Sequence, residues 1–173
     1  MKTCRFLAVL GTTVGALGMT LLFAAPVTAQ DIGLELGTKP GAATVETLEG
    51  KPVDLAEYVG RKPVLMEFWA TWCGNCAKLE PHMLAMHRKY GDKVEFLGIA
   101  VSFNQSVPRV KAYVEKHKLP RVQLFDRKGE AGGAYDAPAT SYVVVLDAMG
   151  KVVYTGLGGD QELEPALRKA IAP

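Results

Sequence analysis

The stretch of chain that decides the fold spans residues 63–76 and reads Pro63-Val64-Leu65-Met66-Glu67-Phe68-Trp69-Ala70-Thr71-Trp72-Cys73-Gly74-Asn75-Cys76. Apart from Glu67, residues 64–69 form a continuous apolar run, which predicts a central strand buried in a sheet. Residues 77–90 carry apolar side chains at helical spacing, so a helix is expected to follow. The stretch therefore predicts a strand that turns into a helix, with two cysteines at the turn.

The two cysteines lie where such a pair can carry electrons. Cys73 is expected at the N-terminus of the helix, where unpaired backbone N–H groups and the helix dipole favour a thiolate. Cys76 follows one helical turn later, close enough to close a disulfide with Cys73. The spacing therefore predicts a redox-active pair, Cys73–Cys76.

Two other interpretations of the pair are half of a zinc site and an inert structural bridge. A tetrahedral zinc site needs about four ligands, and the chain has no second cysteine pair. Its histidines, His82, His87 and His117, do not repeat a ligand spacing. Met83 and Met86 lie at helical spacing, which is typical of core residues rather than of copper ligands. We therefore expect redox chemistry and no metal site.

The N-terminus has the pattern of a secretory signal peptide. A short basic segment precedes an uncharged apolar run, residues 6–25, and cleavage is expected between Ala29 and Gln30. The apolar run is also long enough to span a bilayer, so an uncleaved membrane anchor is the alternative. The predicted organisation is a signal peptide at 1–29, a flexible lead-in at 30–40 and one folded domain at 41–173.

Removal of the signal peptide changes the charge of the chain. The full sequence has 173 residues, with 20 Lys and Arg against 18 Asp and Glu. The signal contributes Lys2 and Arg5 and no acid, so the remainder is balanced at 18 residues of each sign. This balance gives no indication of a nucleic acid partner. The remaining cysteines are Cys73 and Cys76, and an exported protein, periplasmic or otherwise, can keep such a pair oxidised.

The rest of the chain alternates strand and helix patterns. Ser106 and Asp160 are expected as N-caps of the last two helices, and Pro81 is expected to kink the first. The order strand-helix-strand-helix-strand, then a hairpin and a last helix, predicts an α/β sandwich with a parallel core. The expected strands span residues 43–48, 64–69, 94–101, 122–125, 142–146 and 151–155; the expected helices span 77–90, 106–118 and 162–171; segments 53–58 and 129–135 fit short elements.

Residues 68–76, with Pro81 five residues after the second cysteine, resemble the exported thioredoxin-fold oxidoreductases of the TlpA/ResA-like family. The similarity extends over roughly residues 40–172. It includes the Leu119-Pro120 segment before a strand and a hairpin with Gly150-Lys151 at its turn. The resemblance implies an α/β fold, a thioredoxin-like three-layer sandwich whose central mixed β-sheet has helices on both faces.

The resemblance also implies a role for each cysteine. Cys73 would attack as the exposed thiolate and form a mixed disulfide with a client protein, and the more buried Cys76 would resolve it. The expected reaction is reduction of disulfides in exported proteins with cysteine pairs, such as apocytochrome c or copper-site proteins. A membrane thiol donor would supply the electrons, and no organic cofactor is implied. The residues expected to bind the client are Trp72, Gly74, Asn75, Thr140 and Ser141.

Two acidic residues are candidate catalytic groups beside the cysteines. Thioredoxin-like proteins often place a buried carboxylate six residues before the first cysteine, which is Glu67 here. Burial would raise the pKa of Glu67, so it could exchange a proton with Cys76; the alternative is that strand alternation turns it to solvent. Glu80 lies four residues after Cys76, on the same helix face. Its alternative role is a solvated glutamate paired with a lysine.

The chain departs from the family pattern at two positions. Asn75 stands where the family often has proline, a residue associated with its reducing members. Ser141, preceded by Thr140, stands where the thioredoxin fold normally has a cis-proline, and the nearest proline is Pro138. Either the loop is longer and Pro138 fills that place, or the site uses Thr140-Ser141 without proline. A cis bond without proline would cost about 3 kcal/mol, so we expect a trans bond there.

Two rival functions are also compatible with the cysteine pair. A peroxiredoxin-like thiol peroxidase shares the fold, but it usually needs a threonine three residues before its cysteine, and Thr71 is two residues before Cys73. A metal-binding module or copper chaperone would use Cys73 and Cys76 as soft ligands. Peroxide consumption would favour the first rival, and retention of metal by the reduced protein would favour the second.

Overall fold

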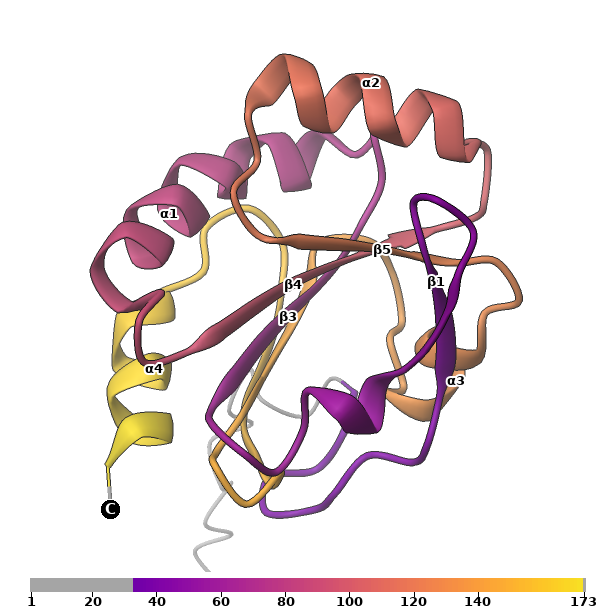
Figure 1. The fold of residues 1–173 in the computed structure, drawn as a ribbon. Helices are drawn as coiled ribbons and strands as arrows, with labels where there is room; N and C mark the ends of the chain where they lie inside the picture. The colour runs from indigo at the N-terminus through magenta and orange to yellow at the C-terminus, as the bar shows by residue number, and fades with distance from the viewer. Residues whose placement is uncertain (1–32, 173) are drawn as a thin grey trace, which may run out of the picture.

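The computed structural model describes residues 33–172 (Figure 1). The predicted signal peptide at 1–29 and the first residues of the predicted lead-in lie outside this range. The secondary structure follows the expected order closely, with β2 and a short 3₁₀ helix, η1, sharing the segment 53–58. In chain order the elements are β1 (Thr44–Thr47), β2 (Pro52–Asp54), η1 (Leu55–Glu57), β3 (Val64–Trp69), α1 (Gly74–Tyr90), β4 (Glu95–Val101), α2 (Val107–His117), β5 (Val122–Asp126), α3 (Glu130–Ala134), β6 (Tyr142–Leu146), β7 (Val152–Leu157) and α4 (Leu163–Ile171).

The strands form one mixed sheet in the order β2-β1-β5-β4-β3-β6-β7. β3, β4 and β5 are parallel to one another, and the remaining pairs are antiparallel. β3 therefore lies near the middle of the sheet, between β4 and β6, and all six of its residues are buried. The register places Glu67 of β3 beside Gly98 of β4 and Val143 of β6.

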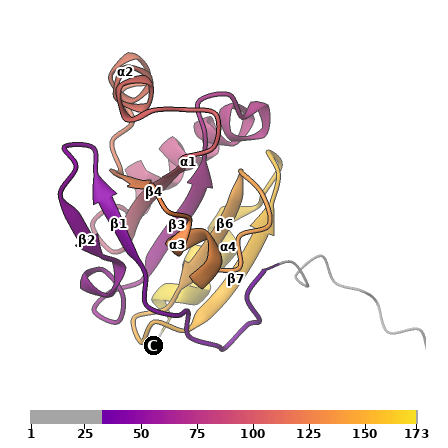
Figure 2. The ribbon, with the colours of Figure 1, turned by 90° about the vertical axis from the view of Figure 1, so that its right-hand side faces the viewer.

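Helices cover both faces of the sheet, which confirms the expected three-layer sandwich. α1, α2 and α4 lie over one face, and α3 lies over the other together with η1 (Figures 1 and 2). The core divides in the same way. One cluster gathers α1 and α4 residues such as Leu79 and Leu167 against the sheet, and another gathers Ala131 and Tyr135 from the α3 side.

Alternation along β3 decides which side chains face the cysteines. Leu65 packs with α1 and α4, and Trp69 packs with Cys73 and Cys76, so both lie on the α1 face. Met66 and Phe68 belong to the cluster on the α3 face. Successive strand residues point to opposite faces, so Glu67, between Leu65 and Trp69 in this alternation, lies on the cysteine face and is completely buried.

The helix starts differ from two of the predictions. α1 begins at Gly74, three residues earlier than expected, because the Cys73 side chain caps it. Asp160 does not cap α4, which begins at Leu163 after Glu162. The Asp160 carboxylate instead accepts a hydrogen bond from Lys78 Nζ of α1 at 2.6 Å. The loop before α4 runs against the start of α1. The positive charge of Lys78 therefore draws the Asp160 carboxylate away from the α4 backbone.

Two prolines lie in helices as expected. Pro108 lies in the first turn of α2, and Ser106 takes the N-cap position, although its side chain makes no capping bond within the described structure. Pro81 lies inside α1, where it removes one backbone donor, and the helix nevertheless continues to Tyr90. The kink expected at Pro81 stays a prediction.

Leu79 tests the packing of α1 against the sheet and α4. Its side chain is fully buried, so Leu79→Ala leaves a cavity and is expected to lower the free energy of unfolding by about 2–5 kcal/mol. Leu36→Ala deletes the same atoms at a site that is 39 % exposed, and it should change the free energy of unfolding by less than about 0.5 kcal/mol. Urea unfolding followed by circular dichroism measures both values. Equal losses in the two variants would contradict this packing.

Candidate redox site

The cysteine pair lies at the junction of β3 and α1. Cys73 is the N-cap residue of α1, and its sulfur accepts a hydrogen bond from the Cys76 backbone N–H at 3.0 Å. The two residues form a disulfide, with Cα atoms 5.3 Å apart, as the spacing predicts. A free helix N–H thus points at the Cys73 sulfur, which favours the thiolate once the disulfide is reduced.

The two cysteine residues differ less in exposure than the sequence suggests. Cys73 is 9 % exposed and Cys76 is 5 % exposed, so Cys73 is only slightly more accessible in the disulfide form. The residues around them are open, since Trp72, Gly74 and Asn75 are all exposed. The pair therefore lies just beneath the surface at the tip of α1, where a partner sulfur can approach Cys73.

An apolar hollow of about 450 Å³ lies beside Trp72. The Trp72 indole N–H donates a hydrogen bond to the Phe103 carbonyl at 2.9 Å, and the two rings meet edge to face. Phe103 is 68 % exposed and Trp72 42 % exposed, although both are large apolar side chains. Thr140 lines the same hollow, so the structure brings together two of the predicted client-binding residues, Trp72 and Thr140.

Ser141 takes the place just before β6, and Pro138 lies three residues earlier in the loop. The Ser141 N–H donates to the Phe68 carbonyl of β3, and its hydroxyl donates to the Gly158 carbonyl. Its own carbonyl accepts from Gln161 Nε2. All peptide bonds between residues 33 and 172 are trans, as expected without proline at this position. Ser141 is fully buried and engaged within the protein, so it positions Thr140, and client contact by either residue stays a prediction.

Glu67 lies buried beneath the cysteine face, as the prediction of a buried carboxylate requires. Its Oε2 accepts a hydrogen bond from Arg121 Nη2 at 2.8 Å. Burial raises the pKa of Glu67 to about 7, although the positive charge of Arg121 acts in the opposite direction. The negative charge of Glu80 adds to the rise. The alternative of a solvent-facing Glu67 is wrong, and its carboxyl group can exchange a proton near neutral pH.

Glu80 reaches the same cation from α1. Its Oε1 and Oε2 accept hydrogen bonds from Arg121 Nη1 and Nη2, at 2.8 and 3.0 Å. The partner of Glu80 is thus a buried arginine, so the alternative of a solvated pair with a lysine is wrong. Arg121 joins the two acids that the sequence singles out, one from β3 and one from the helix that carries Cys76.

Arg121 itself is absent from the residues that the sequence pointed to. It stands one residue before β5, the strand that pairs with β4. The central carbon of its guanidinium lies 5.9 Å from the centroid of the Trp69 ring. The one sequence signal is Gly98, a glycine inside the apolar run of β4. A Cβ there would come within 3.0 Å of Arg121 Nε, so the glycine leaves space for the guanidinium.

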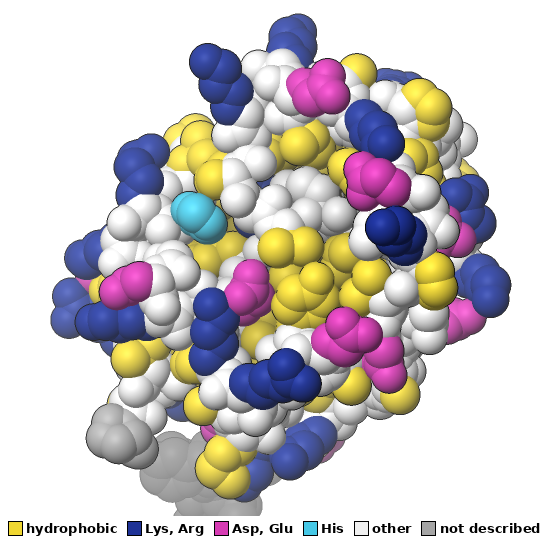
Figure 3. Space-filling model, in the orientation of Figure 1, with side chains coloured by type: hydrophobic (Ala, Val, Ile, Leu, Met, Phe, Trp, Pro, Cys, Tyr) yellow, Lys and Arg dark blue, Asp and Glu magenta, His cyan; other side chains and the backbone are white. Residues whose placement is uncertain are grey.

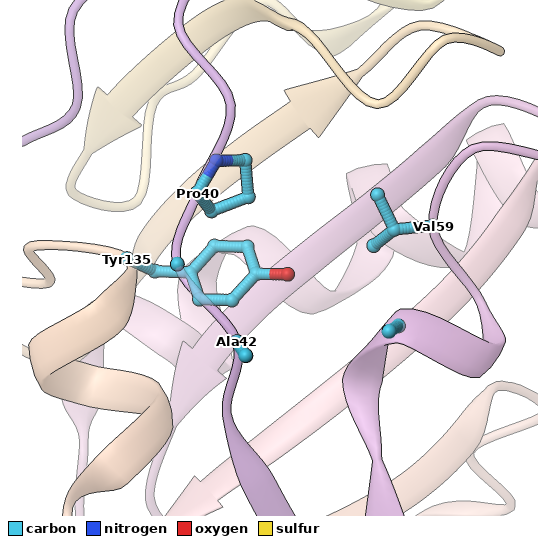
Figure 4. Close-up of a pocket in the computed structure, with 6 residues that line it drawn as sticks. Pro40, Ala42, Val59 and Tyr135 are labelled. Carbon is cyan, nitrogen blue, oxygen red and sulfur yellow. The ribbon is translucent and has the colours of Figure 1, made fainter.

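A smaller hollow lies on the α3 face of the sheet (Figure 4). It measures about 200 Å³ and is lined by Pro40, Ala42, Val59 and Tyr135, among others. Burial raises the pKa of Tyr135, so its hydroxyl stays neutral at any physiological pH. Apart from this hydroxyl, the described side chains that line the hollow are apolar. This hollow therefore offers no ionisable group for catalysis, in contrast to the site around Cys73.

The remaining surface and cluster properties agree with the balanced composition. On the face that Figure 3 shows, Lys and Arg side chains are interspersed with Asp and Glu. Within residues 33–172, no three or more His, Cys, Asp and Glu side chains gather in a way that could hold a metal ion. No helix in this described range is long and apolar enough to cross a membrane.

The raised pKa of Glu67 should make stability depend on pH. The folded protein keeps a proton on Glu67 that the unfolded chain releases above its ordinary pKa of 4.5. This contribution is complete below pH 4.5 and is lost as pH rises through about 7, with a slope of at most about 1.4 kcal/mol per pH unit. Denaturant unfolding across this range should show stability falling with pH, and falling less in Glu67→Gln. Identical pH slopes in both proteins would refute the shift.

Comparisons with known proteins agree with this geometry. The family model described as Redoxin matches residues 35–171. The thiol-disulfide oxidoreductase ResA of Bacillus thuringiensis subsp. konkukian (strain 97-27) is 32% identical over 159 residues, which cover 90% of this chain and 88% of that protein.

Solved structures give the same result. The thioredoxin domain of a thiol-disulfide oxidoreductase from Bacteroides vulgatus is similar with a TM-score of 0.68 and 25% identity, over 80% of this chain and 99% of that one. A secreted Mycobacterium tuberculosis disulfide oxidoreductase, homologous to E. coli DsbE, gives a TM-score of 0.62 and 27% identity, over 73% of this chain and 94% of that one. The chain thus belongs to the redoxin family, as a thioredoxin-fold thiol-disulfide oxidoreductase of the TlpA/ResA-like type.

Proposed function

We propose that this thiol-disulfide oxidoreductase is exported and reduces disulfides in other exported proteins, using Cys73 and Cys76. The observation that carries the proposal is the disulfide at the tip of α1, with a helix N–H directed at the Cys73 sulfur. Such a sulfur is a good leaving group and a good nucleophile near neutral pH. Exported proteins with cysteine pairs, such as apocytochrome c and copper-site proteins, are the proposed clients.

In the proposed first step, the Cys73 thiolate of the reduced protein attacks one sulfur of a client disulfide. The client S–S bond breaks, a bond between Cys73 and the client forms, and the released client sulfur takes up a proton. Cys76 then gives its proton to Glu67 and attacks the Cys73 sulfur. The second client sulfur leaves and is protonated, so two electrons have passed to the client. The protein is left as the Cys73–Cys76 disulfide, which a membrane dithiol donor would reduce by the same exchange.

The proposed client contacts surround the cysteines at the surface. Trp72 and Phe103 expose neighbouring apolar area, and exposed apolar patches commonly mark the sites where proteins bind partners. Thr140 lies across the same hollow, and Gly74 and Asn75 are exposed at the tip of α1. A client segment that brings its cysteine to Cys73 would cover these residues. Metal binding and an organic cofactor have no part in this scheme.

Export is supported by the sequence pattern at residues 1–29 and by one relative. The similar Mycobacterium tuberculosis disulfide oxidoreductase is a secreted protein. Outside the cytoplasm, a client disulfide can persist long enough to need a dedicated reductant. A periplasmic location, or attachment to the membrane through an uncleaved signal, would place the protein beside its electron donor.

The direction of electron flow is tested by the equilibrium reduction potential of residues 30–173. We expect a value near or below about −220 mV, as in thioredoxin and glutaredoxins, measured by glutathione or dithiothreitol titration with thiol trapping. A value near about −120 mV would instead make the protein an oxidant of client thiols. If the two cysteines form no disulfide at any poise, the oxidoreductase function itself is lost, and assays of peroxide consumption and metal retention would then decide between the rivals.

The separate roles of the two cysteines are tested by trapping. Cys76→Ser leaves the attacking sulfur in place but removes the group that releases the client, so a mixed disulfide should accumulate with a disulfide-containing peptide. Cys73→Ser is the matched control and should trap far less. Intact-mass spectrometry without reductant measures both adducts. Equal trapping by the two variants would contradict the assignment of Cys73 as the nucleophile.

A further inference from the structure

Arg121 lies between the two acids at the redox site. Its side chain is 3 % exposed, and it stands just before β5. Its Nη2 binds Glu67 Oε2, and its Nη1 and Nη2 bind both oxygens of Glu80. One buried guanidinium therefore joins an acid of the central strand to an acid of the helix that carries the cysteines.

The position of Arg121 is enforced by its surroundings. Gly98 lies beside Glu67 in the β3–β4 register, and a side chain there would collide with Gln123 Oε1 and crowd Arg121 Nε. The guanidinium also lies over the Trp69 ring, with its central carbon 5.9 Å from the ring centroid. Packed against Gly98 and the Trp69 indole, the buried guanidinium has little freedom to turn away from the two carboxylates.

The hydrogen bonds distinguish the four carboxylate oxygens. Both oxygens of Glu80 accept from Arg121, and so does Oε2 of Glu67. Oε1 of Glu67 is buried and has no hydrogen-bond partner among the described residues. Two acids and one base also leave a net negative charge in a buried place, which favours uptake of one proton. That proton is best accommodated on Glu67 Oε1, because the other three oxygens already accept N–H donors.

We propose that Arg121 is a positioning residue for the redox reaction, which reserves Glu67 Oε1 as the proton-binding atom by occupying Glu67 Oε2 and both oxygens of Glu80. The inference rests on the proposed function, in which Glu67 takes the proton of Cys76. Arg121 touches neither the cysteines nor the client in this scheme. It acts by directing where the proton binds and how tightly.

The charges around Glu67 determine the expected signs. Arg121 lowers the pKa of Glu67 and Glu80 raises it, in addition to the rise caused by burial. From α2, the Tyr113 hydroxyl responds to the same charges, and its ring stacks on His117. From α1, Cys76 packs with Trp69 and does not titrate while it is held in the disulfide. The neighbours of Glu67 in β4 and β6 are Gly98 and Val143, which do not titrate. Substitutions of Arg121 and Glu80 should therefore move the titration midpoint of Glu67 in opposite directions.

The test is a carboxyl carbon NMR titration of the oxidised protein, with Glu67→Gln used to assign the Glu67 signal. Glu80→Gln removes a negative charge and should lower the Glu67 midpoint by about one pH unit or more, a tenfold change in proton affinity. Arg121→Gln removes the cation and should raise it by a similar amount. Both variants weaken the Arg121–Glu80 contact, so a merely structural role would not produce opposite signs.

Two further variants keep the test decisive. Arg121→Gln leaves two buried acids without their cation. If this variant does not fold, Arg121→Lys takes its place in the test. Lysine keeps the charge without the fork, so it should raise the Glu67 midpoint by a smaller amount. Arg127→Gln is the matched control, because Arg127 pairs with Glu46 at an exposed site and should leave the midpoint unchanged. An unmoved midpoint in the Arg121 variant that folds, or an unmoved or raised one in Glu80→Gln, overturns the proposal.

The reduction potential, measured against pH in the same proteins, separates this inference from the proposed function. The pH at which the potential changes slope should follow the Glu67 midpoint in each variant. If every variant forms the disulfide but the midpoints do not move as stated, the role of Arg121 fails and the oxidoreductase function stands. If the wild-type protein forms no disulfide, the function fails, while the same carboxyl titration of the reduced protein still tests how Arg121 distributes the proton.

Discussion

A carboxyl group buried in the central strand constrains this structure more than any other single group. β3 is paired on both edges and covered on both faces, so Glu67 cannot reach water without disrupting the sheet. An unpartnered buried charge would cost several kcal/mol, and the ion pair with Arg121 offsets part of that cost, although burial still raises the pKa of Glu67. Arg121 in turn needs the space that Gly98 leaves in β4. The residue types at Glu67, Gly98 and Arg121, which are far apart in the chain, therefore depend on one another through the buried carboxyl group.

The cysteines take their position from the same strand. β3 ends at Trp69, the chain turns, and Cys73 caps the helix that follows. The helix geometry then places Cys76 one turn from Cys73 and Glu80 one turn further along. Since Glu80 also binds Arg121, the helix that carries the electrons is tied to the buried acid of the strand. A shift of α1 along the sheet would carry the disulfide with it and would separate Glu80 from Arg121.

Local patterns predicted the parts of this site that local interactions build. The continuous apolar run of β3 and the spacing of the cysteines were enough to locate the strand-helix junction, and the apolar neighbours of Glu67 indicated its burial. Arg121 could not be found in this way, because 54 residues separate it from Glu67 and only the register of β4 and β5 brings them together. Asp160 failed as a cap for the same reason, since Lys78, 82 residues away, competes for it.

The proposed client contacts and the proposed proton chemistry occupy different depths of the same site. Trp72 and Phe103 are exposed around the hollow, whereas Glu67 and Arg121 are buried between the sheet and α1. The disulfide and the first turns of α1 are what connects the two regions. A substitution of Trp72 or Phe103 alters the proposed client surface without altering the charge of Glu67, Glu80 and Arg121. A change in Glu67, Glu80 or Arg121 alters proton affinity and leaves Trp72 and Phe103 in place. Under the proposed function, client choice and reduction potential can therefore vary independently.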